Sequence, residues 1–334
     1  MRCPQYSIGY ECFNRAFTGG KPWIWKLSVV NKVEREKGPW PANNLLSSVQ
    51  AWVLERLGGQ PEDREMRSVT RMMLDAVSGL DRGQRIVNDW KANESALDAL
   101  AQWCVRFKKG EPIQYILGAT SFFGVSLKID ARALIPRPET EELIRHLLDQ
   151  QSTSESLRVL DVGTGSGCMA LAWKSQRPQD EVTGVDASHE ALSLARENGV
   201  DLGFEDLNWE LVDVLKPSPF DAVSKAKKGW DVVMSNPPYI PISERQSMEN
   251  RVILHEPSSA LFVSDQDPLS FYVTIASGCL KEGWLTAGGW LGFECHEEFA
   301  SAVEALLSDQ PEWRAIRLLK DLQGAPRMVL AQKK

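Results

Sequence analysis

Apolar residues recur every three or four positions across residues 41–110, and this spacing predicts amphipathic helices. Glycines at 58, 59 and 79 interrupt the pattern and are typical of helix ends. Short helices bury their apolar faces against one another, so the segment is predicted to be a small helical bundle. The four apolar faces are Leu45, Leu46, Val49, Val53, Leu54 and Leu57; Met66, Val69, Met72, Met73 and Val77; Ile86, Val87 and Trp90; and residues 96–107.

The pattern changes to strand-like alternation at residues 122–130, where Gly124 favours a turn between two strands. Residues 111–136 are therefore predicted to form a β-hairpin connector between the bundle and a larger domain at 137–334. Pro136 and Pro138 favour extended backbone, and Thr140 is expected to cap the helix that follows.

Three apolar runs in the larger domain read as buried strands, at residues 157–161, 181–186 and 230–234. A helical pattern follows the first of these runs, and each run ends in glycines or polar residues. This order predicts an α/β domain with a Rossmann-like parallel sheet. In such sheets, ligands bind outside the carboxyl ends of the strands.

A glycine loop follows the first run, with the sequence Gly163-Thr164-Gly165-Ser166-Gly167. Glycines permit a tight turn and a close approach of the backbone to a ligand, with a helix N-terminus behind it. The spacing is Gly-x-Gly-x-Gly and differs from that of dinucleotide binders. Asp186 ends the second run, about 20 residues past the loop, where a ribose-binding carboxylate is expected.

The third run leads into Asn236-Pro237-Pro238-Tyr239. Each proline fixes its own φ and lacks a backbone N–H, so the turn is rigid and rich in acceptors. The Asn236 side-chain oxygen and the Pro237 carbonyl can accept both hydrogens of a planar NH2 group and orient its nitrogen toward a methyl donor. Tyr239 can pack on that planar group. Since the proton can leave after methylation, neither His255 nor His296 is expected to be catalytic.

The chain resembles the HemK/PrmC family of release factor glutamine methyltransferases. The resemblance extends from about residue 45 to the end of the chain. Its most specific motifs are GEPIQYILG and LIPRPETEELI, since the Asn-Pro-Pro-Tyr turn also occurs in adenine methyltransferases. The matching segments are GEPIQYILG (110–118), FFG (122–124), LIPRPETEELI (134–144), DVGTGSG (161–167), GVD (184–186), SNPPYIP (235–241), HEPSSALF (255–262), DPLSFY (267–272), GGWLGFE (288–294) and DLQGAPRMVL (321–330).

The resemblance implies a seven-stranded class I methyltransferase domain behind the bundle and the hairpin, S-adenosylmethionine as donor, and a peptide chain release factor as protein substrate. The acceptor would be the glutamine amide of a Gly-Gly-Gln tripeptide. Val214 stands where some members carry an aromatic residue against the adenine. The implied cofactor residues are Gly163, Thr164, Gly165, Ser166, Gly167, Asp186, Asp213, Val214 and Asn236. The implied substrate residues are Asn236, Pro237, Pro238 and Tyr239, with Asn236, Pro237 and Tyr239 catalytic.

Charge, hydropathy and the distribution of cysteines and histidines bear on which partners the chain can have. The net charge of −7 gives no general attraction to phosphate backbones, so no sequence-specific nucleic acid partner is expected. No apolar run approaches the roughly 20 residues that span a bilayer, so no membrane partner is expected. Scattered cysteines and four dispersed histidines predict no metal site. Two alternatives remain open: a DNA adenine methyltransferase, and a catalytically silent scaffold that binds S-adenosylmethionine.

Residues 1–40 are expected to be a leader or a presequence. Arg2, Arg15, Lys21 and Lys26 face a single acid, Glu11, before the charged run near residue 35. An acid-poor segment with arginines is compatible with a mitochondrial presequence. A mitochondrial location is therefore expected, with a bacterial-type cytoplasmic location as the alternative.

Four further features keep two interpretations each. Arg137 and Glu139 could form an ion pair between domains or contact substrate. Glu256 could anchor its own loop or support the turn at Asn236. Glu294 is expected to satisfy nearby backbone groups, with a part in the chemistry as the alternative. A basic run at residues 225–228, within an inserted loop, is a solvated surface or a contact for acidic partners.

Overall fold

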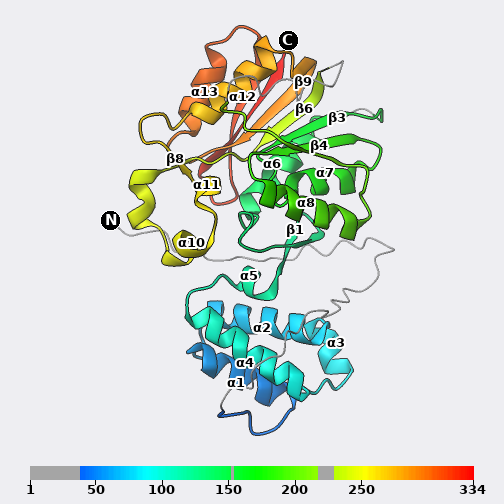
Figure 1. Ribbon diagram of the computed structural model, residues 1–334, viewed down its shortest axis with the longest axis vertical. Helices are drawn as coiled ribbons and strands as arrows, with labels where there is room; N and C mark the ends of the chain where they lie inside the picture. Colours follow the sequence, from blue (N-terminus) through cyan, green and yellow to red (C-terminus); the bar gives the residue numbers. More distant parts are fainter. Residues whose placement is uncertain (1–37, 152–153, 217–228) are drawn as a thin grey trace. The chain divides into compact units, whose positions relative to one another are not determined.

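The computed structural model describes residues 38–151, 154–216 and 229–334 (Figure 1). The expected leader lies outside these residues, apart from positions 38–40, and so does the basic run at 225–228. The chain divides into two compact units, Met1–Leu117 and Gly118–Lys334, and each is described by itself.

The first unit is helical where it is described. Asp63, Asp81 and Asn93 cap three of its helices, each accepting a hydrogen bond from a backbone N–H of the first turn. Its core is apolar, with Val53, Met73 and Leu100 fully buried. The helices are α1 (Leu46–Leu57), α2 (Arg64–Ser78), α3 (Arg82–Val87), α4 (Glu94–Lys108) and α5 (Ile113–Leu117).

The apolar face predicted for the third helix is wrong. Helix α3 forms, but Ile86 and Val87 are 61% and 84% exposed. The buried side chain of α3 is Arg85, whose guanidinium donates to the Asp75 carboxylate and to the Leu80 carbonyl, both at 2.5 Å. A six-residue helix can dock through one ion pair, and the hydrophobic pattern does not report that contact.

The second unit opens with a hairpin of β1 (Ala119–Phe122) and β2 (Val125–Lys128). The hairpin is shorter than the connector predicted at residues 111–136, because residues 113–117 form helix α5 of the first unit. Phe123 and Gly124 form its turn with φ of +47° and +80°, as a two-residue turn with two positive φ values requires. Asn198 fixes the hairpin to α8 (His189–Leu202), because its side chain exchanges hydrogen bonds with the backbone of Lys128 at 2.7 and 3.1 Å. The hairpin thus packs as part of the larger unit.

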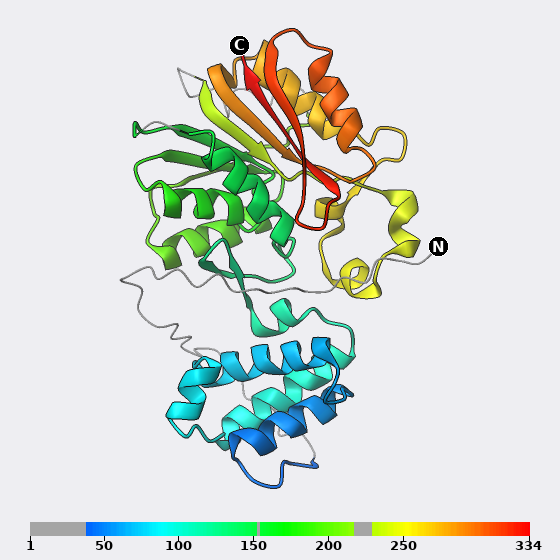
Figure 2. The same cartoon turned by 180° about the vertical axis from the view of Figure 1, so that it is seen from behind.

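The predicted seven-stranded sheet is confirmed. Its order is β10-β11-β9-β6-β3-β4-β5, and β11 runs opposite to the other six strands. Figure 2 shows β10 and β11 side by side at one edge. The strands are β3 (Arg158–Val162), β4 (Glu181–Asp186), β5 (Asn208–Leu211), β6 (Trp230–Ser235), β9 (Leu285–Glu294), β10 (Trp313–Lys320) and β11 (Pro326–Lys333).

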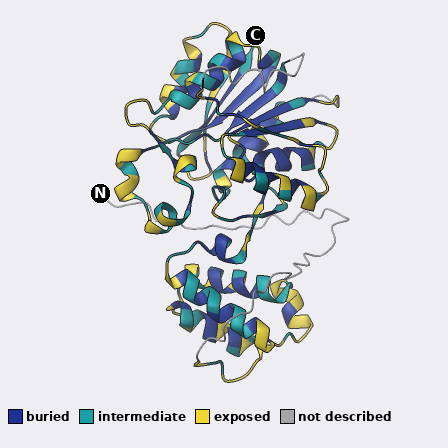
Figure 3. Ribbon diagram, in the orientation of Figure 1, coloured by how far each residue is buried: buried dark blue, intermediate teal, exposed yellow. Residues whose placement is uncertain are grey.

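Alternate residues of the strands enter two apolar layers. Val159 and Val232 pack on one face of the sheet with α6 (Pro138–Leu148) and α7 (Cys168–Gln176). Leu160 and Val233 pack on the other with α12 (Ser270–Lys281) and α13 (Ala300–Ser308). Both faces are covered, so the middle strands are buried, as Figure 3 shows in dark blue.

Between β6 and α12 the chain leaves the sheet, and we call residues 240–263 the excursion. Its two short strands pair in parallel and close it on itself. Among the described residues, no helix combines the length and the apolar character needed to cross a bilayer. The excursion contains β7 (Ile240–Pro241), η1 (Ile242–Ser247), α10 (Asn250–His255), α11 (Ser258–Leu261) and β8 (Phe262–Val263).

Candidate active site

Three predicted segments meet at the carboxyl ends of β3, β4 and β6. The strand order reverses there, because β3 pairs with β4 on one side and with β6 on the other. The Gly163 N–H donates to the Val185 carbonyl at 2.9 Å, and a Cβ on Gly163 would lie 4.0 Å from the Asn236 carbonyl oxygen. The glycine loop, the end of β4 and the turn at Asn236 therefore lie next to one another, at the place where open α/β sheets bind ligands.

The glycine loop is packed on one side and open on the other. Its three glycines have φ of +74°, +54° and +81°, a region that other residues adopt only with strain. A Cβ on Gly167 would lie 2.9 Å from the Trp209 ring, whereas a Cβ on Gly165 would meet no described atom within 4 Å. Ser166 is buried, and its carbonyl accepts from the Asn198 side chain at 3.0 Å. The open side leaves room for a ligand against the backbone.

Asp186 links the loop to the end of β4. Its two carboxylate oxygens accept from the Gly165 N–H at 2.9 Å and the Ser188 N–H at 2.8 Å. Burial raises the pKa of Asp186, and these N–H groups oppose the rise. The carboxylate thus orders the loop by accepting a hydrogen bond from its backbone.

Asp213 and Val214 follow β5 at the next strand end. The Asp213 carboxylate accepts from the Leu215 N–H at 3.1 Å and lies 3.3 Å from the Lys216 ammonium. The Val214 side chain is 6% exposed and belongs to the apolar core beneath the sheet. It therefore offers a ligand little side-chain surface.

Asp161, the last polar residue of β3, is fully buried under the loop. One carboxylate oxygen accepts from the Thr164 hydroxyl at 2.6 Å and from the Ala170 N–H at 3.2 Å. The other oxygen has no hydrogen-bond partner among the described residues. Burial raises the pKa of Asp161 to about 7, although the bonds from Thr164 and Ala170 oppose the rise.

The raised pKa of Asp161 predicts a pH-dependent stability. Between its ordinary pKa of 3.8 and about 7, the folded state holds a proton that the unfolded state releases, so the unfolding free energy falls as pH rises. Asp161→Asn keeps the size and removes the titration. The variant should gain stability relative to the wild type from pH 4 to pH 8, by on the order of 4 kcal/mol. Urea unfolding at several pH values measures this gain, and the exposed Asp309→Asn is the control. A pH-independent difference would contradict the assignment.

The turn at Asn236 connects to two buried residues from other elements. The Asn236 Nδ2 donates to Thr140 Oγ1 at 3.1 Å, and Thr140 Oγ1 donates to Glu294 Oε2 at 2.5 Å. The Tyr239 hydroxyl donates to the second oxygen, Glu294 Oε1, at 3.1 Å. We call Asn236, Thr140, Glu294 and Tyr239 the Glu294 network. Pro237, directly after Asn236, is buried and holds the turn.

Two sequence expectations are wrong here. Thr140 does not cap α6, because Arg137 is the N-cap and Pro138 opens the helix, which places Thr140 inside the first turn. The Glu294 side chain accepts from two side-chain hydroxyls instead of from backbone groups.

Pro238 is half-buried between Pro237 and Tyr239. No local pattern reports the bond between Thr140 and Glu294, which joins α6 to the end of β9.

Burial governs the protonation of the network. It raises the pKa of the Glu294 carboxyl to about 7, and the hydrogen bonds from Thr140 and Tyr239 oppose the rise. Burial, together with the nearby Glu294 charge, also holds the pKa of the Tyr239 phenol well above its ordinary value. Tyr239 therefore remains a donor.

Glu256 supports the segment before α6. Its carboxylate accepts from the Arg137 guanidinium at 2.6 Å and from the Ile135 N–H at 3.1 Å. The Glu256 side chain is 1% exposed. It therefore ties the Pro-rich segment to the excursion within the second unit, and this ion pair of Arg137 does not join two domains.

Removing Arg137 should leave a buried carboxylate with a single N–H donor. We expect Arg137→Met to lower the unfolding free energy of the second unit by about 3 kcal/mol. Thermal and urea unfolding measure the loss, with the exposed Arg314→Met as a matched control. Equal stabilities of the two variants would show that the pair does not anchor this segment.

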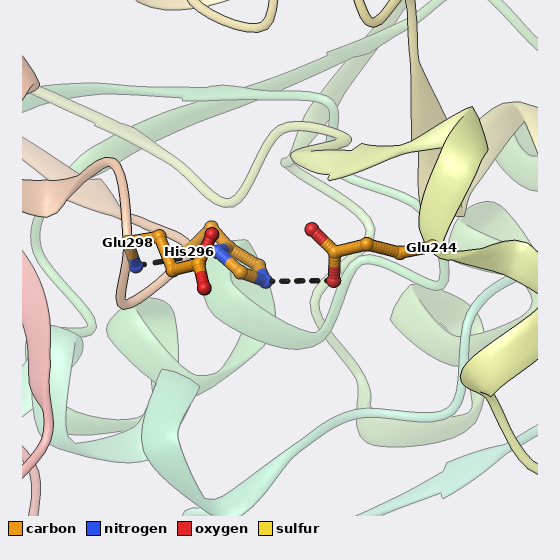
Figure 4. A group of neighbouring side chains, drawn as sticks. All are labelled: Glu244, His296 and Glu298. Atoms are coloured by element: carbon orange, nitrogen blue, oxygen red, sulfur yellow. Dashed lines mark hydrogen bonds and ion pairs between the residues drawn. The ribbon is translucent and has the colours of Figure 1, made fainter.

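Sequence analysis missed a cluster of one histidine and two glutamates, Glu244, His296 and Glu298 (Figure 4). His296 Nε2 is 3.4 Å from the Glu244 carboxylate, and its Nδ1 accepts from the Glu298 N–H at 3.3 Å. The side chains of Glu244, His296 and Glu298 offer ligand atoms within 4.8 Å of one another. Protein groups contact both ring nitrogens of His296. The contact with Glu244 therefore joins the excursion to the segment that follows β9. The Tyr239 and His296 rings are 6.0 Å apart.

An open pocket of about 530 Å³ lies next to the end of β4. Ser188 and Glu190 line it on one side, Asp130 and Arg132 on another, and Pro257 belongs to the excursion. Because Ser188 bonds to Asp186, the pocket borders the carboxylate that orders the glycine loop.

Comparison with known proteins gives the family of the chain. A family model for the methyltransferase small domain matches residues 139–261, and one for the PrmC N-terminal domain matches residues 48–118. The release factor glutamine methyltransferase of Flavobacterium psychrophilum is 31% identical over 85% of this chain and 98% of its own length. That of Streptococcus pneumoniae is 39% identical over 66% of this chain and 74% of its own length.

Among solved structures, the release factor-specific protein-(glutamine-N5) methyltransferase of Alicyclobacillus acidocaldarius is 26% identical. It covers 60% of this chain and 94% of its own length, with a TM-score of 0.38. Because two family models together match more than half of the chain, and relatives above 30% identity cover most of it, this chain belongs to the release factor glutamine methyltransferase (HemK/PrmC) family.

Proposed function

We propose that this chain transfers a methyl group from S-adenosylmethionine to the side-chain amide nitrogen of the glutamine in a release factor's Gly-Gly-Gln motif. One observation carries the proposal. The Asn236 side-chain amide is tied through its nitrogen to Thr140, which leaves the side-chain oxygen as an acceptor, and the Asn236 backbone lies beside the glycine loop. That arrangement suits an incoming NH2 group next to a donor bound on the loop.

The residues at the ends of β3 and β4 fit S-adenosylmethionine. The open side of Gly163 and Gly165 admits a ligand against the backbone, and the buried Asp161 keeps one oxygen without a partner among the described residues. Residues 163–167 would hold the methionine portion, and Asp186 the ribose hydroxyls. Asp213 and Val214 would border the adenine, with Val214 contributing little contact. The bound cofactor supplies an electrophilic methyl carbon on a positively charged sulfur.

Asn236 and Pro237 would act by orienting the amide nitrogen of the substrate glutamine. Amide nitrogens are weak nucleophiles because the lone pair is delocalised into the carbonyl. The Asn236 oxygen and the Pro237 carbonyl accept the two N–H hydrogens, increase electron density on nitrogen and direct it toward the methyl carbon. The cofactor would supply the methyl carbon and keep the sulfur electron pair, and the amide nitrogen held by Asn236 and Pro237 would then lose one proton to solvent. Orientation of this kind can supply up to roughly 7–11 kcal/mol.

Tyr239 and Pro238 complete the acceptor side. The Tyr239 ring is fixed by its hydroxyl bond to Glu294, so it presents a flat surface to a planar amide. Pro238 keeps the backbone rigid between the two functional side chains. In this proposal the helical unit, predicted at residues 41–110, recognises the protein substrate.

A methyl-transfer assay tests the function. The full chain is incubated with S-adenosylmethionine carrying a radioactive methyl group and a bacterial-type release factor. Parallel reactions contain the same factor with Gly-Gly-Ala in place of Gly-Gly-Gln, or adenine-rich duplex DNA. Label in the first reaction alone is expected. Label in DNA would indicate an adenine methyltransferase. Cofactor binding without any labelled acceptor would indicate a scaffold, and either result would overturn the proposal.

We also propose a mitochondrial location, from the acid-poor composition of residues 1–40. The relatives named above are bacterial, so a bacterial-type cytoplasm is the alternative. A fluorescent protein fused behind residues 1–40 should enter mitochondria. A diffuse cytoplasmic signal would favour the alternative.

A further inference from the structure

We propose that Thr140 and Glu294 are positioning residues that fix which face of the Asn236 amide meets the substrate, and so select glutamine over glutamate as the acceptor. The inference rests on the proposed function. It concerns two side chains that are buried beneath the acceptor turn, with exposed fractions of 2% and 1%.

The direction of the hydrogen bonds sets the Asn236 orientation. A hydroxyl carries one hydrogen, and when Glu294 is ionised the Thr140 hydrogen is donated to its carboxylate over 2.5 Å. Toward Asn236 the Thr140 oxygen can only accept, and it receives the Nδ2 hydrogen at 3.1 Å. Turning the amide by half a rotation would set two acceptor oxygens against each other with no hydrogen between them. The Asn236 oxygen therefore points away from Thr140.

Glu294 maintains the orientation of the Asn236 amide, because it accepts the Thr140 hydrogen. Its second oxygen accepts from the Tyr239 hydroxyl at 3.1 Å, so both functional side chains of the turn depend on one carboxyl. The Glu294 backbone carbonyl is held in turn by the Tyr272 hydroxyl, also at 3.1 Å. The carboxyl is thus fixed at both its backbone and its side chain.

The orientation of the Asn236 amide determines whether glutamine or glutamate is the preferred acceptor. An outward Asn236 oxygen attracts the NH2 group of glutamine and repels the carboxylate of glutamate. A freely rotating Asn236 could present its own NH2 group to glutamate. Loss of the Thr140 hydroxyl should therefore weaken catalysis and the choice of acceptor together, while cofactor binding persists.

The test compares Thr140→Val, which removes the hydroxyl at nearly constant volume, with Thr140→Ser, which retains it. Calorimetry gives the Kd of the full chain for a release factor with Gly-Gly-Gln and for one with Gly-Gly-Glu, with S-adenosylhomocysteine in excess. In Thr140→Val the preference for Gly-Gly-Gln should fall roughly 10-fold, and kcat should fall roughly 10- to 100-fold. Thr140→Ser should retain both, and the Kd for S-adenosylmethionine should not change.

A second variant, Glu294→Gln, tests the same inference if Thr140→Val does not fold. Glu294→Gln keeps the volume and neutralises a buried carboxyl, so it should fold, and its NH2 group can donate to the Thr140 oxygen and free the Thr140 hydrogen to turn Asn236. Its preference for Gly-Gly-Gln should fall as well. Unchanged preference and kcat in the folded variants would overturn the inference while the wild type still methylates the release factor. A wild type that methylates no release factor would instead refute the proposed function.

Discussion

Asn236→Ala should lower kcat for glutamine methylation by roughly 10³-fold, the loss typical of removing one positioned hydrogen-bonding group from an active site. The variant lacks the oxygen that accepts the substrate N–H, and only the Pro237 carbonyl remains to orient the amide. The Kd for S-adenosylmethionine should stay within about 2-fold of the wild type, because the glycine loop and Asp186 are intact. Single-turnover methylation gives the rate, and calorimetry gives the Kd.

Asn208→Ala is the matched control for Asn236→Ala. Asn208 is exposed at the start of β5, away from the turn, so its removal should leave kcat unchanged. A normal kcat in Asn236→Ala would show that the turn does not orient the acceptor, and the mechanism proposed above would be wrong.

Asp186→Ala should raise the Kd for S-adenosylmethionine by roughly 100-fold. A hydrogen bond to a charged group contributes about 1.5–3 kcal/mol, and this carboxylate is expected to bind the ribose hydroxyls. Its loss also releases the Gly165 N–H, which it holds at 2.9 Å, so the loop loses part of its order. Calorimetry on the full chain measures the change.

The exposed Asp309→Ala serves as the control for Asp186→Ala. It should bind the cofactor as the wild type does. An Asp186→Ala variant with the wild-type Kd would contradict the placement of the ribose. It would also show that the open side of the glycine loop binds the donor without this carboxylate.

Local patterns in the sequence were sufficient for most of the fold. The helix period located α1, α2 and α4, where a large apolar face is buried, and the glycine loop and Asp186 marked the ends of β3 and β4. The same reasoning misplaced Ile86 and Val87, because α3 docks through the ion pair of Arg85. Hydrophobic spacing reports burial of apolar faces and does not report a buried charge.

The site was predicted unevenly for a related reason. Asn236 and Tyr239 stand in a compact motif, so their proximity follows from the sequence itself. Thr140 and Glu294 lie in segments far apart in the chain, and only the packing of α6 beside β9 brings them together. The pairs Arg137–Glu256 and Glu244–His296 also join distant segments. A sequence motif therefore identifies the side chains proposed to contact the substrate. The side chains that orient them come from distant segments and are found only from the tertiary structure.

Tandem mass spectrometry of a release factor after reaction with the full chain and S-adenosylmethionine tests the central claim most directly. We expect one added methyl group, located on the side chain of the Gly-Gly-Gln glutamine and absent after reaction with Asn236→Ala. A methyl group on any other residue, or an unmodified glutamine after reaction with a chain that binds the cofactor, would contradict it.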